Sequence, residues 1–514
     1  MITSWVSLII FNEILQNIFK HLIMIQLINK VTNEKALENA VQRYKERGII
    51  LPTFAQQQNP ELIPEKIKDQ LKNVGLWEIN PLNLFRITWK NEPKEQGGLF
   101  GGVNYIELPK EITGVDARIV LLIGKWFPTG AHKVGAAYGC LAPSITTGGF
   151  DPTYHKAVWP STGNYCRGGA FDSKLMGTES VAILPEEMSK ERFEWLRDVI
   201  GSEVIATPGC ESNVKEIYDK CWEIRETRPE CIIFNQFDEF GNAVWHYNTT
   251  GKAIEEVYNK IKTEKSNLAA YVSATGSAGT IAAGDYLRTF IPQIKVVASE
   301  ALQCPTLLNN GFGGHRIEGI GDKHVPWIHN SKNTDMVTAI DDENCMRLLR
   351  LFNEKEGLKY LKSCGISDEI ANELHLLGIS SIGNLLSAIK TAKYYEMTSD
   401  DVIITVATDS ADLYNSRIEE QTALKGNYSE LQAAKDFEKC LLGEKTDNMK
   451  ELNYNDRKAI HNLKYYTWIE QQAKELEDLN QMWYDREIWN KIFNQTKRWD
   501  ELINEFNERT GLLK

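Results

Sequence analysis

Short apolar runs recur along the middle of the chain and alternate with stretches whose apolar residues have helical spacing. Such runs, rich in valine, isoleucine or leucine, are typical of strands buried on both faces of a sheet. The predicted strands are Arg118 to Ile123, Ser180 to Leu184, Glu203 to Thr207, Leu268 to Val272, Lys295 to Ser299 and Val402 to Val406. Because helical stretches separate them, we predict an α/β fold with mainly parallel sheets, divided between two three-layer domains.

The segment before these strands has a different pattern. Residues 33–75 are predicted to be helical, with breaks at Pro52, Pro60 and Pro64, and residues 77–109 are rich in loop-forming glycine. The first 24 residues begin with an apolar stretch that is too short and too polar to span a membrane, and they lack the basic start of a signal peptide. They form either an amphipathic helix or an upstream extension of the reading frame, with Met24 as the true start.

The character of the sequence changes again after Ser416. Residues 417–514 are charged, poor in glycine and rich in helix formers, with a stripe of large apolar residues at helical spacing: Trp489, Ile492, Phe493, Trp499, Ile503 and Phe506. We expect helices that pack on the rest of the chain or on a second subunit. A regulatory or partner-binding appendage is the alternative. The chain thus divides into an N-terminal helical extension (1–79), a core (80–416) and a helical C-terminal extension (417–514).

Composition narrows the class of protein. The chain has 514 residues, enough for two or more domains, and its net charge of −12 argues against nucleic acid as the main partner. Its nine cysteines are scattered without a C-x-x-C pair. That pattern is typical of reduced thiols in the cytoplasm, and it argues against a disulfide framework or a structural metal site. We expect no metal, no nucleic acid and no membrane among its partners.

One lysine stands out for its local sequence. Phe127-Pro-Thr-Gly-Ala-His-Lys133 places Lys133 on a tight glycine turn, ahead of the small-residue run Val134 to Tyr138. A lysine there can begin a helix with its amine directed inward, and a partly desolvated amine loses its proton more easily and becomes a nucleophile. The alternative is an ordinary solvated surface charge.

Three later segments favour a cofactor site. Pro160-Ser-Thr-Gly-Asn164 can expose backbone N–H groups that bind a carboxylate, and the Asn164 amide adds a donor. Ser273-Ala-Thr-Gly-Ser-Ala-Gly-Thr280 lies between a predicted strand and a predicted helix, where glycines and hydroxyls suit a phosphate. The strand Val402 to Val406 is followed by Asp409 and Ser410, and strand ends are where open α/β sheets place ligand contacts.

In this order, the four segments resemble those of the fold-type II pyridoxal-phosphate enzymes, which include cysteine synthase, cystathionine β-synthase, threonine synthase and the tryptophan synthase β-chain. The resemblance covers roughly residues 80–415. Further matching segments are Leu184-Pro-Glu-Glu-Met-Ser-Lys-Glu-Arg192, Gly201-Ser-Glu203, Asn235-Gln-Phe237, Thr249-Thr-Gly251, Ser299-Glu300 and His315-Arg-Ile-Glu-Gly-Ile-Gly321. They are most similar to cysteine synthase, and the Asp409-Ser410 pair is most similar to cystathionine β-synthase.

The resemblance implies a role for each matching residue. Lys133 forms the internal aldimine with pyridoxal 5'-phosphate and moves the α-proton, and Asn164 bonds to the phenolic oxygen of the cofactor. The phosphate is bound by Gly276, Ser277, Ala278, Gly279 and Thr280. The substrate carboxylate is bound by Ser161, Thr162, Gly163 and Gln236. The cofactor lies in a cleft between a small domain, about residues 135–245, and a larger one from the flanking segments, in a homodimer.

Ser410 is implied to face the pyridine nitrogen. A hydroxyl cannot keep a proton on that nitrogen as a carboxylate does, so the ring becomes a weaker electron sink, and prompt loss of a β-leaving group is favoured. Asp409 is adjacent, and its carboxylate would protonate the ring if it pointed inward. Since neighbours along a strand point to opposite faces, we expect only one of the two to face the cofactor.

Two residues depart from the cysteine synthase pattern beside Asn164. Arg167 either binds a second carboxylate of the substrate or forms a structural salt bridge at a helix start. Cys166 is either reactive or inert packing. The triplet Ala131-His-Lys133 is similar to the tryptophan synthase β-chain, but the glutamate-bearing segment of that chain is missing, which argues against indole chemistry.

The predicted function is β-elimination or β-replacement on a small amino acid of the serine, O-acetylserine or cysteine type, through an aminoacrylate, as in cysteine synthase. A lyase of the threonine synthase or serine/threonine dehydratase type is the alternative enzyme. A non-catalytic binding partner that keeps the fold is the alternative of another class.

Overall fold

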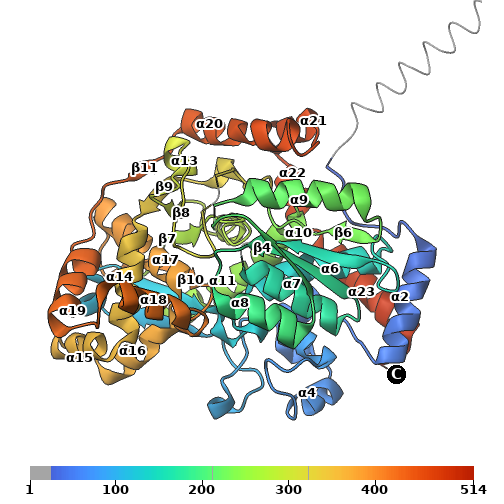
Figure 1. The fold of residues 1–514 in the computed structure, drawn as a ribbon, viewed down its shortest axis with the longest axis horizontal. Coiled ribbons are helices and arrows are strands. Elements are labelled where there is room, and N and C mark those ends of the chain that lie inside the picture. The colour runs from blue at the N-terminus through green and yellow to red at the C-terminus, as the bar shows by residue number, and fades with distance from the viewer. Residues whose placement is uncertain (1–24, 162, 211, 322, 514) are drawn as a thin grey trace, which may run out of the picture.

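The computed structural model describes residues 25–161, 163–210, 212–321 and 323–513. The expectations for the first 24 residues and for Thr162 therefore lie outside the described residues. Two sheets with helices on their faces form the body of the molecule (Figure 1). This is the mixed α/β fold that the hydrophobic pattern predicts. None of the described helices is long and apolar enough to cross a lipid bilayer.

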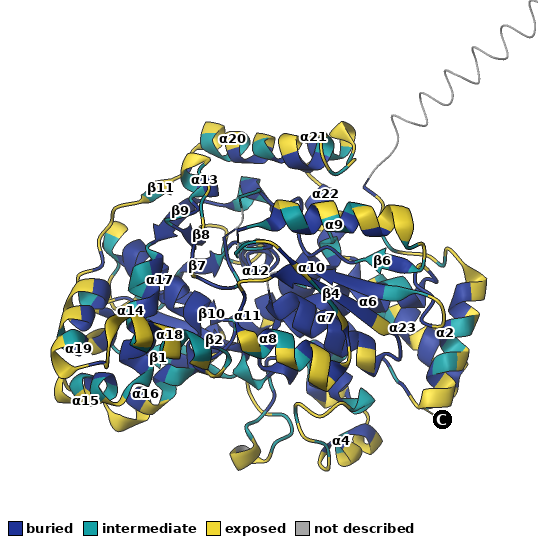
Figure 2. Ribbon diagram, viewed as in Figure 1, coloured by how far each residue is buried: buried dark blue, intermediate teal, exposed yellow. Residues whose placement is uncertain are grey.

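The larger sheet has seven strands in the order β1-β2-β10-β7-β8-β9-β11. Its central strands run parallel, whereas β1 and β11 pair antiparallel at the two edges. The strands are β1 (Tyr105–Leu108), β2 (Arg118–Ile123), β7 (Asn267–Ala274), β8 (Lys295–Ala301), β9 (Met336–Ile340), β10 (Asp401–Ala407) and β11 (Met449–Glu451). The central strands are buried on both faces, as a parallel sheet requires (Figure 2).

The smaller sheet has four parallel strands in the order β5-β4-β3-β6. These are β3 (Lys156–Pro160), β4 (Glu179–Pro185), β5 (Glu203–Thr207) and β6 (Cys231–Ile233). All six strands predicted from the apolar runs are present in the two sheets. The division of the core into domains at residues 135 and 245 stays a prediction.

Helices cover both sheets, and α17, nearly all of it buried, packs on β7, β8, β9 and β10. The helices of this region are α5 (Lys110–Thr113), α6 (Lys133–Thr146), α7 (Asn164–Leu175), α8 (Lys190–Glu194), α9 (Val214–Thr227), α10 (Phe240–Trp245), α11 (Gly251–Ile261), α12 (Ala282–Arg288), α13 (Thr306–Asn309), α14 (Asp342–Asn353), α15 (Lys355–Ser363), α16 (Asp368–Glu373), α17 (Ile379–Tyr394) and α18 (Asn415–Lys425). The 3₁₀ turns η4 (Gly124–Trp126) and η5 (Pro128–Gly130) lead into α6, and the π-helical turn η6 (Trp195–Ile200) follows α8.

The predicted N-terminal helical segment contains α2 (Glu34–Arg47), α3 (Phe54–Gln58) and α4 (Glu65–Leu71). Its prolines lie between the helices, because a proline lacks the N–H that a helix interior needs. Pro52 precedes α3, and Pro64 is the N-cap residue of α4.

The C-terminal segment contains α19 (Glu430–Asp436), α20 (Tyr454–Lys464), α21 (Leu476–Tyr484), α22 (Ile488–Phe493) and α23 (Thr496–Thr510). The predicted apolar stripe is buried, but it is divided between α22 and α23. Helix α23 packs against α2 and α6. The Asp500 carboxylate accepts hydrogen bonds from the N–H groups of Phe54 and Ala55, and the Asn507 side chain bonds both backbone groups of Leu51. The C-terminal helices therefore pack on the rest of the chain, which is one of the two arrangements expected from the sequence.

Candidate active site

Lys133 is the first residue of α6, at the end of a strained turn. Thr129 and Gly130 both have positive φ, 68° and 74°, which is uncommon for a β-branched residue such as threonine. The N–H of His132 donates to the carbonyl of Thr408, 3.3 Å away, and this bond joins the turn to the end of β10. Lys133 is buried, and its Nζ donates to Ser277 Oγ at 3.1 Å. The amine therefore lies at the glycine-rich loop that the sequence singles out.

That loop connects β7 to α12 and contains Gly276 to Thr280. Ala278 has a φ of 59°, and the two glycines lie against other parts of the chain. A Cβ on Gly279 would lie 1.9 Å from Asn242 Oδ1, and one on Gly276 would lie 2.8 Å from the carbonyl oxygen of Gly319. Glycine is needed at both positions because the neighbours leave no room for a side chain.

The hydroxyls of this loop contact the surrounding side chains. Ser277 Oγ accepts hydrogen bonds from Lys133 Nζ and from Asn242 Nδ2, the latter at 3.0 Å. Thr280 Oγ1 lies 3.5 Å from His246 Nε2. Burial, together with the charge of nearby Lys133, lowers the pKa of the His132 imidazole well below its ordinary value, and the same holds for His246. Both rings are therefore neutral beside the amine, and neither had a role in the sequence-based prediction.

Ser161 and Gln236 lie together at the carboxyl end of the smaller sheet. Gln236 Nε2 donates to Ser161 Oγ at 3.1 Å, and the N–H of Gly163 donates to the same oxygen at 3.1 Å. Gly163 itself faces Arg192, because a Cβ there would lie 2.0 Å from Arg192 Nη1. The structure thus brings together three of the four residues predicted to bind the substrate carboxylate.

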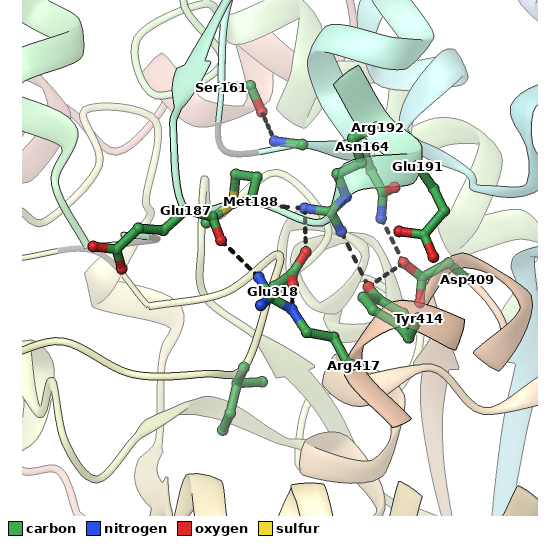
Figure 3. A network of polar contacts seen from close by, with 12 residues as sticks. Ser161, Asn164, Glu187, Met188, Glu191, Arg192, Glu318, Asp409, Tyr414 and Arg417 are labelled. Atoms are coloured by element: carbon green, nitrogen blue, oxygen red, sulfur yellow. Dashed lines mark hydrogen bonds and ion pairs between the residues drawn. The ribbon is translucent and has the colours of Figure 1, made fainter. Parts of the chain in front are cut away.

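Asn164 begins α7 and faces Asp409. Its Nδ2 donates to Asp409 Oδ2 at 2.6 Å, and Tyr414 donates its hydroxyl to the same oxygen, also at 2.6 Å (Figure 3). Burial raises the pKa of the Asp409 carboxyl, while the bonds from Tyr414 and Asn164 oppose that shift. Strand β10 ends at Ala407, so the alternation expected along a strand does not extend to Asp409 and Ser410. Both residues are buried, and Asp409 points toward Asn164.

A buried charge cluster lies on the other side of Tyr414. Arg192 Nη1 forms an ion pair with Glu318 Oε2 at 2.8 Å, and Arg192 Nη2 donates to the Tyr414 hydroxyl at 3.2 Å (Figure 3). Arg417 Nε donates to Glu318 Oε1 at 2.6 Å, and Arg417 Nη2 donates to the carbonyl of Glu187 at 2.7 Å. The segments that contain Arg192 and Glu318 were recognised in the sequence as similar to the family. Nothing in the sequence indicated that these two residues form an ion pair.

Cys166 is fully buried beside this cluster, and its Sγ donates to the carbonyl of Gly163 at 2.9 Å. Burial raises the pKa of its thiol to about 12. The thiolate needed for reaction is therefore scarce at neutral pH, and Cys166 is a packing residue rather than a reactive one.

The chemistry of these donors fits pyridoxal 5'-phosphate. The loop of Gly276 to Thr280 offers hydroxyls and closely packed backbone to a phosphate, and the amine of Lys133 lies at that loop for an aldehyde. Asn164 uses one of its two amide hydrogens on Asp409, which leaves a second donor for a phenolic oxygen.

Comparisons with known proteins identify the family. The family model described as "Pyridoxal-phosphate dependent enzyme" matches residues 110–381. A probable cysteine synthase of Bacillus subtilis is 28% identical over 301 residues, which cover 58% of this chain and 89% of that protein. Cystathionine β-synthase of Saccharomyces cerevisiae is 26% identical over 330 residues, covering 62% of this chain and 61% of that protein.

The fold is also found among solved structures. O-acetylserine sulfhydrylase isoform 3 of Entamoeba histolytica aligns with a TM-score of 0.53 and 23% identity, over 66% of this chain and 94% of that one. At this low identity, the alignment shows a shared fold and nothing further. The family match covers more than half of the sequence and includes Lys133, Asn164 and the glycine-rich loop. The chain therefore belongs to the pyridoxal-phosphate dependent enzymes.

Proposed function

We propose that this enzyme catalyses β-replacement or β-elimination on a small amino acid of the serine, O-acetylserine or cysteine type, as cysteine synthases do. The observation that carries the proposal is the 3.1 Å contact between Lys133 Nζ and Ser277 Oγ, which joins the amine to the loop suited to a phosphate. The cysteine synthase and cystathionine β-synthase relatives support it, since their similarity extends over 301 and 330 residues.

Pyridoxal 5'-phosphate, when bound, supplies an aldehyde and an electron-withdrawing ring that acidifies the α-carbon of an amino acid. Lys133 would hold the aldehyde carbon and then carry the α-proton on its Nζ. Ser161, Gly163 and Gln236 would bind the α-carboxylate, together with Thr162, and Asn164 would donate to the phenolic oxygen. The loop from Gly276 to Thr280 would hold the phosphate.

The end of β10 supports β-chemistry in particular. We assign Ser410 to the ring nitrogen, because the Asp409 carboxylate is already engaged by Tyr414 and Asn164. A hydroxyl leaves that nitrogen less protonated than a carboxylate does, so the ring would be a weaker electron sink. The electron pair freed at the α-carbon would then expel the β-leaving group rather than be drawn into the ring.

Borohydride reduction followed by peptide mapping tests the assignment of Lys133. The reduced cofactor should be found on Lys133, and Lys133→Ala should lose the cofactor's absorbance band and about 10³-fold in turnover. Lys174→Ala, an exposed lysine of α7, is the matched control and should behave like the wild type. An adduct on another lysine would contradict the assignment. A protein that stays colourless with added cofactor would favour the non-catalytic alternative.

The substrate is tested by titrating the holoenzyme with serine, O-acetylserine, cysteine, threonine and homoserine phosphate while following its absorbance. A spectral change and product formation with the first three support the proposal. Turnover of threonine or homoserine phosphate alone would favour the lyase alternative.

A homodimer and a cytoplasmic location complete the proposal. The nine cysteines form no disulfide among the described residues and most of them are buried, which is compatible with a reducing compartment. Light scattering coupled to size-exclusion chromatography tests the dimer, and a mass of one chain would contradict it.

A further inference from the structure

Arg167 lies on the first turn of α7, three residues after Asn164. Residues spaced by three on a helix share a face, so Arg167 is on the side of α7 that carries Asn164 toward Asp409. Only 7% of Arg167 is exposed. Its guanidinium stacks on the ring of Trp195, 4.7 Å from the ring centroid.

This guanidinium has no hydrogen bond and no ion pair with any residue that the structure describes, and its Nε is a buried donor without a partner. The structural salt bridge considered from the sequence is therefore not formed. Stacking on Trp195 uses the flat face of the group and leaves the N–H donors around its edge available.

The neighbouring arginines, in contrast to Arg167, form ion pairs. Arg192 pairs with Glu318 at 2.8 Å, and Arg417 pairs with Glu318 and with Glu420. Burying a charge without a partner destabilises the folded chain. An anionic ligand bound to Arg167 would offset that free-energy cost.

Charged groups of the site act on Arg167. Burial and the charge of Arg192 lower its pKa to about 10, while Cys166, Asp409 and Tyr414 act in the opposite direction. The group remains charged at neutral pH, and one of the charges that act on it is Asp409, which accepts a hydrogen bond from Asn164.

We propose that Arg167 binds a second anionic group of the amino-acid substrate, a carboxylate or a phosphate carried by its β-substituent. This inference rests on the proposed function and adds to it the class of substrate. The forked donors of an arginine match both anions, whereas a lysine offers only a point charge. Ser161, Gly163 and Gln236 would bind the α-carboxylate, so that the two ends of the substrate are held by different elements.

Charge-matched pairs of amino acids test the proposal on the holoenzyme. We would titrate aspartate against asparagine, glutamate against glutamine, and O-phosphoserine against O-acetylserine, following the cofactor's absorbance. In at least one pair the anionic member should bind about 10- to 100-fold more tightly, since a charge-assisted pair is lost with the neutral member. The pair that shows the preference identifies the anion as a carboxylate or a phosphate.

The variants Arg167→Met and Arg167→Lys should reduce that preference, to near unity for methionine and to an intermediate value for lysine. Arg197→Met is the matched control, because Arg197 is an exposed arginine that stacks on Phe193 nearby, and its preference should equal that of the wild type. Each preference is a ratio within one variant, so partial loss of folded protein does not change it.

A wild-type enzyme that binds both members of all three pairs equally would overturn the proposal, as would an unchanged preference in Arg167→Met. A holoenzyme that binds and turns over no amino acid would instead contradict the proposed function itself, and this inference would fall with it.

Discussion

At the scale of single residues, Asn242 holds the glycine-rich loop in place. Its Nδ2 donates to Ser277 Oγ at 3.0 Å and to the carbonyl of Gln236 at 2.9 Å. The missing side chain of Gly279 makes room for this amide. Gly279 thus fixes the position of the Ser277 hydroxyl, which accepts a hydrogen bond from Lys133.

Gly279→Ala should weaken cofactor binding by about 10- to 100-fold, because the new Cβ would lie 1.9 Å from Asn242 Oδ1 and would displace Asn242 from Ser277. The measurement is the dissociation constant of pyridoxal 5'-phosphate, by absorbance titration of the apoprotein. Gly102→Ala is the control, since nothing lies within 4 Å of a Cβ there. Equal affinity in the two variants would contradict this role of Gly279.

The sequence indicated several of these residues and missed others for a physical reason. Lys133 and Ser277 belong to short motifs, and a motif shows in the sequence whatever its surroundings. The pairing of Arg192 with Glu318 depends on how distant segments fold together, and no local pattern records it. The direction of Asp409 was also beyond the sequence, since it depends on where β10 ends.

At the scale of elements, the strands rich in branched apolar residues were predictable to within two residues at each end. The strands β1, β3, β6, β9 and β11 were not predicted. Strand β3 begins with Lys156 and ends with Pro160, and β6 has only three residues, so neither shows a clear apolar run. The break between α22 and α23 was hidden too, because the apolar stripe keeps its helical spacing across it.

Trp499→Ala should lower the free energy of unfolding by about 3–5 kcal/mol, because it leaves a cavity between α23 and α3. Trp499 is 1% exposed, packs on Phe54 at 5.3 Å between ring centroids, and donates its Nε1 to the carbonyl of Ile28. Urea denaturation followed by circular dichroism measures the loss. Tyr466→Ala, at a 60% exposed tyrosine, should change stability by less than about 0.5 kcal/mol. Similar losses in both variants would show that α23 does not depend on this contact.

At the scale of the whole molecule, buried histidines link stability to pH. Burial lowers the pKa of His329 to about 3 and that of His461 to about 2, from an ordinary value of 6.5. The folded chain keeps these rings neutral, while the unfolded chain binds protons below pH 6.5. Stability is therefore full above about pH 6.5 and is lost as the pH falls toward the folded values.

Each such histidine should cost about 1.4 kcal/mol of stability by pH 5.5. His461→Gln should remove one contribution, because glutamine can still donate to the carbonyl of Leu479, which His461 Nε2 contacts at 3.0 Å, but it takes up no proton. Denaturant unfolding at pH 7.5 and 5.5 gives the difference. His375→Gln, at a histidine that is only partly buried, should leave this difference in stability unchanged. A pH dependence in His461→Gln equal to the wild type would contradict this account.

The bonds of Asp500 and Asn507 to residues 51–55 have a consequence for biosynthesis. A ribosome makes residues 51–55 long before it makes α23, so the backbone groups of that segment find these partners only after α23 has been synthesised. The start of α3 thus depends on a segment that is translated much later. A premature stop codon ahead of α23 would leave that early segment exposed to quality-control proteases, although its own sequence is intact.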